Sequence, residues 1–425
     1  MFLGGRLKNL KAALLKVLVF LLPTQLGYHF WPHWAYVFGI RIDYLSPTVY
    51  LTDIVIGALA FLWLFEKKSK KATRIFLFLS LLGLFASVNI LLADLAMAAL
   101  FKWLKVGELI FVAFIVFQDK SLDIKKTIVR PLTFAAVFVF LVAVAQVVLQ
   151  RSVGGPLYFL GERTFNSGTP GISLYSIFGK SLLRPYSTFS HPNSMAGFAG
   201  VALLFLIGLG RELKEKGLVL YLGAAAFLGT LLLSGSEAAI GGLFLVTVLY
   251  VLGRERKELF GKILLTAAAI MVFASMLLPL VANKTLSEKI VFSERVGQRL
   301  VLADLAGRLY AQKPLVGLGL NNFIPETVEL KAADYYSWVL QPVHNVPLLV
   351  LVETGMVGFG IFVLFLFRLI KKAMVMPIFF GLAIIFILIT ALVDHYWLTL
   401  QQNQLLLAVF IGIIFRQNKR GFLLN

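Results

Sequence analysis

A histidine before a long apolar stretch, and a carboxylate within that stretch, are the first side chains whose types suggest chemistry. His344 directly precedes the stretch, and an imidazole that titrates near neutral pH suits the removal of a proton from a hydroxyl. A single histidine in such a place more often caps a helix or marks an interface. Glu353 follows nine residues later, so a helix puts it about 13 Å deeper and on the opposite face. We therefore expect no catalytic His344–Glu353 pair, and Glu353 needs a partner or a cavity of its own.

Arginines supply groups that bind anions. Arg184 lies eight residues before Pro192, and Ser190 or His191 is placed to cap a helix that begins at this proline. The free N–H groups and positive potential of such a helix start, together with Arg184, could hold an anion. Simple capping beside an interfacial arginine is the alternative.

A second group of arginines lies in a segment with a helix-like apolar face. At about 100° per residue, Arg295 and Arg299 lie roughly 40° apart and can share one ligand, whereas Arg308 lies about 180° from Arg299. Asp304 precedes Arg308 by four residues, a spacing that suits a structural ion pair. The sequence therefore favours Arg295 and Arg299, and not Arg308, as ligands of an anion.

Signals for a metal or a cofactor are weak. The chain has no cysteine, which excludes disulfides, iron–sulfur clusters and thiol catalysis. Its histidines and carboxylates lack the spacing of a clustered metal site, and the glycines of Gly317-Leu318-Gly319 lack the lysine of a phosphate loop, so they indicate a turn. Asp394 lies in a short polar turn near the C-terminus, where it could orient a histidine or an arginine or cap a helix. We expect no metal and no cofactor.

Apolar helices must position these side chains. The chain is 59% hydrophobic and 14% charged, whereas soluble chains are about half apolar and about a quarter charged. Apolar stretches of about 17 to 25 residues, the length that crosses a bilayer, recur along the chain and predict an all-α polytopic bundle of twelve transmembrane helices. The weakest are 96–117, which holds Lys102, Lys105 and Glu108, and the divided stretch 218–252. The predicted spans are 11–27, 48–65, 75–93, 96–117, 131–150, 192–209, 218–234, 237–252, 263–281, 345–367, 374–393 and 400–416.

The charge distribution predicts the orientation, because Lys and Arg concentrate in the cytoplasmic loops of membrane proteins. With the N-terminus inside, the cytoplasmic segments hold 26 of the 40 Lys and Arg and 7 of the 21 Asp and Glu, which is the whole net charge of +19. We expect both termini in the cytoplasm, and basic residues that face anionic lipid and not nucleic acid.

The outward side of this topology holds the long polar segments. They are 28–47, 151–191 and 282–344. One integral membrane domain, residues 1–425, is expected, with the large, partly helical extracytoplasmic loop 282–344 carrying part of the site. All five histidines fall in outward loops or at outward ends of spans: His29, His33, His191, His344 and His395.

Three ordered motifs resemble the bacterial O-antigen ligase and polysaccharide polymerase superfamily of membrane glycosyltransferases. They cover about residues 180–360, and the predicted topology extends the resemblance to nearly the full chain. The ordered set is more specific than any one motif. The motifs are Arg184-Pro185 with Phe189-Ser190-His191-Pro192-Asn193, Arg299-Leu300 with Pro314-Leu315-Val316-Gly317-Leu318-Gly319 and Phe323, and His344-Asn345 with Val352-Glu353-Thr354-Gly355.

The resemblance implies an inverting, metal-independent transfer of a glycan. The donor would be an undecaprenyl-diphosphate-type lipid carrier, and the acceptor a hydroxyl on the outer, periplasmic or extracellular, face of the inner or plasma membrane. Arg184 and Arg299, joined by Arg295 on the face of Arg299, would hold the diphosphate, and His344 would assist deprotonation of the acceptor. Many members read Ser-Arg before the eighth span, where this chain has Ser236-Glu237. Supporting candidates are His191, Asn193, Asn345 and Asp394.

The resemblance leaves the acceptor open, since members attach glycans to lipid A core, proteins, growing polysaccharide or other envelope polymers. A polysaccharide polymerase and a protein O-oligosaccharyltransferase are therefore alternatives. A secondary transporter is the rival from another class, because intramembrane charges such as Glu108 and Glu353 are common in transporters. The concentration of polar residues in one outward loop, without an inverted repeat, favours the enzyme. A non-catalytic scaffold is a further alternative.

Overall fold

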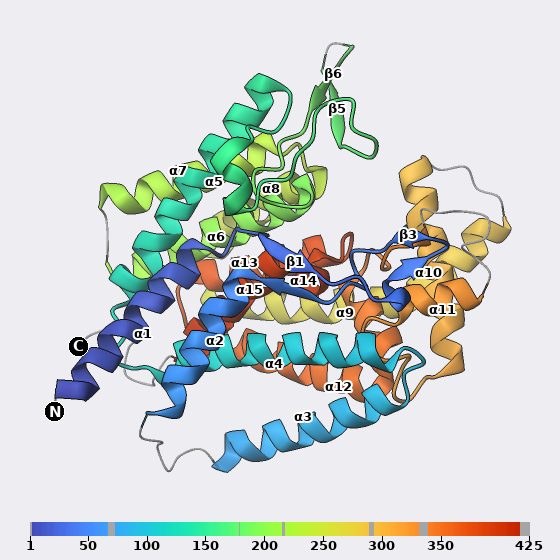
Figure 1. Cartoon of the computed structure of the whole chain (residues 1–425), viewed down its shortest axis with the longest axis horizontal. Coiled ribbons are helices and arrows are strands. Elements are labelled where there is room, and N and C mark those ends of the chain that lie inside the picture. The colour runs from blue at the N-terminus through green and yellow to red at the C-terminus, as the bar shows by residue number, and fades with distance from the viewer. Residues whose placement is uncertain are drawn as a thin grey trace.

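The computed structural model of the chain is mostly helical, and a helix overlaps each of the twelve predicted spans (Figure 1). The structure describes residues 2–66, 73–177, 179–214, 217–288, 293–330 and 339–416. The helices that overlap the spans are α1 (Phe2–Phe20), α2 (Leu51–Leu64), α3 (Thr73–Leu91), α4 (Ala96–Gln118), α5 (Arg130–Leu149), α6 (Pro192–Glu212), α7 (Leu218–Leu233), α8 (Glu237–Gly253), α9 (Lys257–Ser287), α12 (Val346–Ala373), α13 (Ile378–Ala391) and α15 (Gln401–Arg416).

Four helical segments of the described chain are long and apolar enough to cross a membrane. They are Lys125–Leu149, which joins the π-helical turn η3 (Lys125–Val129) to α5, and Pro192–Glu212, Glu258–Ser287 and Val346–Ala373. Shorter apolar helices lie at five further predicted spans: Leu51–Leu64, Leu79–Leu91, Leu218–Leu233, Glu237–Gly253 and Ile378–Ala391. Twelve crossings, with both termini in the cytoplasm, stays a prediction.

The first and last helices meet at one loop on one side of the molecule (Figure 1). Lys11 of α1 forms an ion pair with Asp119 at 3.4 Å. Arg416, at the end of α15, donates from Nη2 to the carbonyls of Lys120 and Leu122 at 3.0 and 3.1 Å. The N-terminal part of α1 and the C-terminal end of α15 therefore lie on the same side of the molecule, as a topology with an even number of crossings requires.

Short β-hairpins, which the sequence patterns did not predict, lie in two of the segments predicted to face outward. At the first segment, β1 (Gly27–His29) pairs with β4 (Thr48–Tyr50), which occupies the first residues of the predicted span 48–65. Within the segment, β2 (Tyr36–Val37) pairs with β3 (Ile40–Arg41). In the segment before α6, β5 (Leu174–Ile177) pairs with β6 (Lys180–Leu183). All three pairs are antiparallel and two-stranded.

Two of the differences between helix boundaries and predicted spans affect the segments predicted to face outward. Helix α1 ends at Phe20, before the predicted end at residue 27, because a turn over residues 21–23 leads into β1. Helix α9 continues to Ser287, so the first six residues of the predicted loop 282–344 are helical. They contain no glycine or proline, and such a helix can continue beyond the apolar stretch. The rest of the loop contains α10 (Glu294–Gln312) and α11 (Phe323–Glu329).

Helix α12 is interrupted by a loop segment that hydrogen-bonds into it. Gly355 lies within α12 with φ +62°. Two N–H groups of the loop 314–319 donate to the carbonyls of Val352 and Glu353 at 3.1 and 3.0 Å, and two N–H groups just beyond Gly355 donate back to loop carbonyls at 2.9 and 3.1 Å. The loop thus replaces hydrogen bonds that a continuous helix would make to itself. Gly317 and Gly319 have φ +77° and +99°, which confirms the predicted turn.

This interruption gives Glu353 a structural partner. Its buried Oε1 accepts a hydrogen bond from the backbone N–H of Phe323, where α11 begins, at 3.3 Å. Asn89 of α3 reaches the same place, because its Nδ2 donates to the carbonyls of Glu353 and Val316 at 3.0 and 2.9 Å. Two motifs of the family pattern, Pro314–Gly319 and Glu353–Gly355, are therefore two sides of one backbone junction.

Replacing Gly355 with alanine is expected to destabilise the protein. A Cβ atom there would lie 2.4 Å from the backbone of Leu315, and the positive φ disfavours any side chain. The backbone conformation alone costs about 1–3 kcal/mol, and the clash adds to it. Gly360→Ala is the control, because it lies in the same helix and its Cβ would meet nothing within 4 Å. Thermal unfolding in detergent measures both variants, and equal midpoints for the two would contradict the expectation.

Candidate active site

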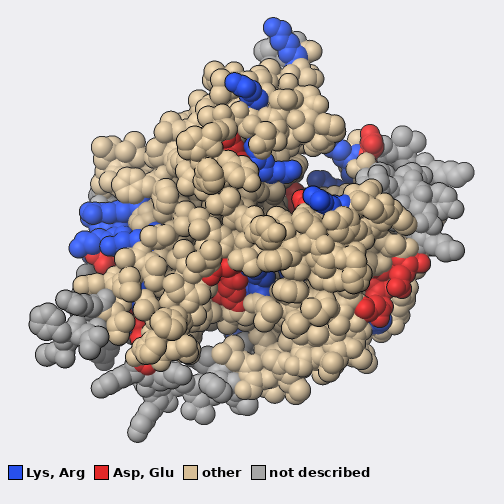
Figure 2. Space-filling model, in the orientation of Figure 1, with Lys and Arg blue, Asp and Glu red and all other residues tan. Residues whose placement is uncertain are grey.

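A cavity of about 1190 Å³ collects residues from all three predicted outward segments and from the turn between α13 and α15. Figure 2 shows basic side chains gathered around a hollow in the face of the molecule that it draws. Pockets for one small ligand have about 300–1,000 Å³, so this cavity has room for more than one substrate group. Seven of the eight predicted site residues line it: Arg184, His191, Asn193, Arg295, Arg299, His344 and Asp394.

Arg184 is fixed at the start of the pocket-lining segment that follows β6. Its Nε donates to the carbonyl of Ser234 at 2.8 Å, and its Nη2 donates to Oδ1 of Asn193 at 2.7 Å. These two bonds orient the plane of the guanidinium, and Arg184 as a whole is only 9% exposed. No described residue makes a hydrogen bond to Nη1, so this edge remains for an anion, to which arginine can donate two parallel bonds.

Asn193 joins Arg184 to Asp394. While its Oδ1 accepts from Arg184, its Nδ2 donates to Oδ2 of Asp394 at 3.2 Å, and the other carboxylate oxygen accepts from the backbone N–H of His395 at 2.8 Å. Burial alone would raise the pKa of Asp394, but His395, His344 and His191 nearby and the Asn193 hydrogen bond outweigh it and lower the pKa. Asp394 is therefore a carboxylate at neutral pH.

His344 has the properties of a general base. Burial lowers its pKa, the negative charge of Asp394 raises it and the positive charge of Arg299 lowers it, and the net shift is downward. The imidazole is therefore neutral at pH 7 and can accept a proton. Its Nδ1 is buried and makes no hydrogen bond to any described residue.

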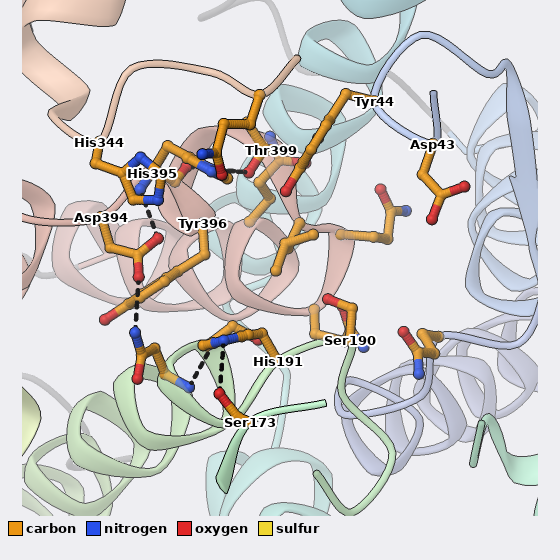
Figure 3. A pocket seen from close by; sticks show the side chains of 18 of the residues that line it. Asp43, Tyr44, Ser173, Ser190, His191, His344, Asp394, His395, Tyr396 and Thr399 are labelled. Atoms are coloured by element: carbon orange, nitrogen blue, oxygen red, sulfur yellow. Dashed lines mark hydrogen bonds between the residues drawn. The ribbon is translucent and has the colours of Figure 1, made fainter. Parts of the chain in front are cut away.

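His395 lies in the site, although the sequence singled it out only as an outward histidine. Its ring centroid lies 4.8 Å from that of His344 and 5.3 Å from that of Tyr44, which comes from the first outward segment (Figure 3). Its Nδ1 lies 2.8 Å from Oγ1 of Thr399. Burial lowers the pKa of His395 to about 3. In the sequence, its position directly after Asp394 was the one sign that His395 belongs to the site. Tyr44 could be assigned to the site only from the packing of the first outward segment against this turn.

His191 caps helix α6 and also lines the cavity. It is the N-cap of α6, with Pro192 in the first turn, and its Nδ1 accepts from the backbone N–H of Asn193 at 3.1 Å. Its Nε2 lies 3.4 Å from Oγ of Ser173, and burial lowers its pKa to about 4. Capping is therefore confirmed, and the same cap places Asn193 between Arg184 and Asp394.

Asn345 is a cap and not a pocket residue. Its Oδ1 accepts from the backbone N–H of Leu348 at 2.9 Å, which starts α12. Its Nδ2 donates to the carbonyl of Leu392 at 3.2 Å and so ties this start to the end of α13. Asn345 supports the site by fixing the backbone next to His344.

The arginines of α10 lie as the helical spacing predicted. Arg295 and Arg299 both line the cavity. Arg308 lies outside its lining and donates from Nε to Oδ2 of Asp304 at 2.8 Å, so the structural ion pair is confirmed. Glu237 also lines the cavity, and its negative charge acts on Arg184.

Two groups of described residues bring potential metal ligands together despite their separation in sequence. The ligand atoms of His344, Asp394 and His395 all lie within 4.8 Å of one another, and so do those of Asp94, Glu326 and Glu329. In each group, residues close in sequence meet a residue from a distant segment only in the fold, so the spacing along the sequence does not reveal the cluster.

A mostly helical chain with four apolar helices long enough to cross a membrane has the pattern of a multi-pass membrane protein, and its cavity is lined by several arginines and histidines. Residues 222–363, which are 142 of the 425 residues, match the family described as O-antigen ligase, and this confirms the resemblance to the O-antigen ligase superfamily. The matched segment contains Arg295, Arg299 and His344 and the junction at Gly355; Arg184 and Asp394 lie outside it. No curated protein matches the chain.

Proposed function

We propose that this protein transfers a glycan from an undecaprenyl-diphosphate-type carrier to an acceptor hydroxyl at the outer face of the cytoplasmic membrane, with inversion and without a metal. The observation that carries the proposal is the single cavity that holds Arg184, Arg295 and Arg299 together with His344 and Asp394. The family match supports a glycan-transfer enzyme of the ligase type in a membrane.

In the proposed reaction, the acceptor oxygen forms a bond to the anomeric carbon while the bond from that carbon to the diphosphate breaks. The proton of the acceptor hydroxyl goes to His344. The leaving diphosphate gains negative charge, which Arg184, Arg295 and Arg299 stabilise where it develops. Asp394 stabilises the imidazolium that forms on His344, and Asn193 keeps the carboxylate in place.

A cell that lacks the protein provides the test of the reaction class. Mass spectrometry of its glycoconjugates is expected to show unextended acceptors and accumulated carrier-linked glycan, and the unextended acceptor identifies the substrate. This outcome decides among a ligase, a polymerase and a protein O-oligosaccharyltransferase. A normal glycan profile with altered solute uptake would instead favour the transporter.

Reconstitution provides the test of the mechanism. Purified protein given the carrier-linked glycan and that acceptor is expected to form product equally well with and without a chelator. Loss of activity on chelation, with recovery on adding a divalent metal, would overturn the metal-free mechanism.

The pH dependence of transfer follows from the lowered pKa of His344. Transfer requires neutral His344, so the rate is expected to fall as pH decreases through its pKa, with a midpoint below the ordinary value of 6.5. Asp394→Asn removes the charge that raises this pKa, so the midpoint moves to lower pH while the maximal rate also falls. The pH profile of the initial rate measures both effects.

The control for this profile is Glu329→Gln, which removes an exposed carboxylate that lies outside the cavity lining. It is expected to leave the midpoint unchanged. An acidic limb that does not move in Asp394→Asn would contradict the electrostatic link between Asp394 and His344.

A further inference from the structure

We propose that His344, Asp394 and His395 form a binding site for a zinc-type transition-metal dication, and that an ion bound there inhibits the enzyme. The inhibition rests on the proposed function, whereas binding of the ion does not. The proposal is compatible with metal-free transfer, because the ion acts here as an inhibitor.

The donor set and its spacing fit such an ion. Two imidazoles and one carboxylate offer ligand atoms within 4.8 Å of one another (Figure 3). Zn²⁺ bonds of about 2.0–2.2 Å place tetrahedral ligands roughly 3.4 Å apart, so the ligand atoms must approach one another by up to about 1.4 Å. Rotation of the side chains about their χ angles can supply this, and all three residues line the cavity.

The hydrogen bonds of His395 prepare one nitrogen for a metal. The hydroxyl of Thr399 donates to the carbonyl of His395 at 3.2 Å, so its oxygen accepts from Nδ1 of the same residue at 2.8 Å. This favours the tautomer with hydrogen on Nδ1 and a lone pair on Nε2. Metal-binding histidines are commonly held this way, with the other ring N–H donated to an oxygen.

The other two ligands are also prepared. Both oxygens of Asp394 accept a hydrogen bond, from Asn193 at 3.2 Å and from the backbone of His395 at 2.8 Å, as in the outer shell of a metal-binding carboxylate. In His344, Nδ1 is buried without a hydrogen bond to any described residue. A buried polar atom without a partner costs free energy, and a ligand near this ring would offset that cost.

The second cluster lacks these properties. Lys313 lies 2.8 Å from Asp94 and 3.5 Å from Glu326, so an ammonium group already occupies the space between the carboxylates. The cluster also contains no imidazole. Nitrogen ligands favour Zn²⁺ over Mg²⁺ and Ca²⁺, which prefer oxygen.

Two arginines limit the affinity, and the position of the ion explains the inhibition. The positive charges of Arg184 and Arg299 act on Asp394 and His344 and oppose a dication. A metal bound to His344 takes the lone pair that would accept the proton of the acceptor hydroxyl. Transfer should therefore stop while the ion is bound and recover when a chelator removes it.

The binding test uses Co²⁺ as a spectroscopic probe of the purified full chain in detergent, with Zn²⁺ as competitor. We expect visible absorption bands of a four- or five-coordinate Co²⁺ ion, which Zn²⁺ abolishes and Mg²⁺ leaves unchanged. His395→Gln should weaken binding more than tenfold, and Thr399→Val should weaken it about tenfold, because it removes an outer-shell partner. His33→Gln, an exposed histidine outside the cavity lining, is the control and should bind as the wild type does.

The activity test follows the same variants. Zn²⁺ should inhibit wild-type transfer reversibly, and Thr399→Val should need about tenfold more Zn²⁺ for half-inhibition. Absence of the Co²⁺ bands, or bands unchanged in His395→Gln, would overturn the site. Metal binding in a protein that transfers no glycan would instead contradict the proposed function and leave the site intact.

Discussion

His344→Gln is expected to lower the turnover of glycan transfer by about 10²–10⁴-fold, the usual contribution of a positioned general base. Glutamine is neutral and polar but cannot take a proton. Because Nδ1 of His344 makes no hydrogen bond to any described residue, the change removes little that stabilises the fold. Binding of the carrier should be almost unchanged, since the arginines and not His344 contact the diphosphate in the proposed complex.

Initial rates at saturating donor and acceptor measure the effect, and thermal unfolding in detergent verifies that the variant is folded. His33→Gln is the matched control, because it makes the same change at an exposed outward histidine. Turnover near that of the wild type in a folded His344→Gln protein would remove His344 from the mechanism.

Arg299→Ala has the second large expected effect, a loss of about 10²–10³-fold in kcat, which is typical when one group that stabilises developing negative charge is removed. Arg299→Lys should recover only part of this loss, because an ammonium keeps the charge but not the planar pair of donors. If Arg299 also binds the ground state of the carrier, KM for the donor should rise in Arg299→Ala as kcat falls.

Arg308→Ala on the same helix is the control. Arg308 lies outside the cavity lining, its side chain is 63% exposed, and its ion pair with Asp304 contributes at most about 1 kcal/mol. Its transfer rate should match that of the wild type. Equal losses in Arg299→Ala and Arg308→Ala would indicate damage to α10 as a whole and would contradict a specific contact between Arg299 and the diphosphate.

The local parts of the site could be predicted from the sequence, because they depend on spacing along one element. The helical period separates Arg295 and Arg299 from Arg308, and the structure confirms both the shared face and the Asp304–Arg308 pair. The cap of α6 at His191 likewise depends on neighbouring residues. The lengths of the apolar stretches also predicted the approximate positions of the twelve helices that overlap the predicted spans, including the charged α4.

Contacts between distant segments could not be predicted. Asn193 and Asp394 are 201 residues apart, and their hydrogen bond exists only because α6 packs against α13 and the turn that follows it. The sequence also could not predict the insertion of the loop 314–319 into α12 at Gly355, since each motif alone indicates no more than a turn.

His344, which lies before an apolar helix, illustrates which properties the sequence determines and which only the tertiary structure decides. The sequence by itself determined that His344 lies just before a helix and that Glu353, on another face and deeper, is not its partner. The tertiary structure alone decided that Asp394 and His395 surround His344 and that Arg299 lies close enough to lower its pKa. The physical reason is that helix period and capping act over a few residues, whereas the packing of helix ends depends on contacts spread over the whole chain.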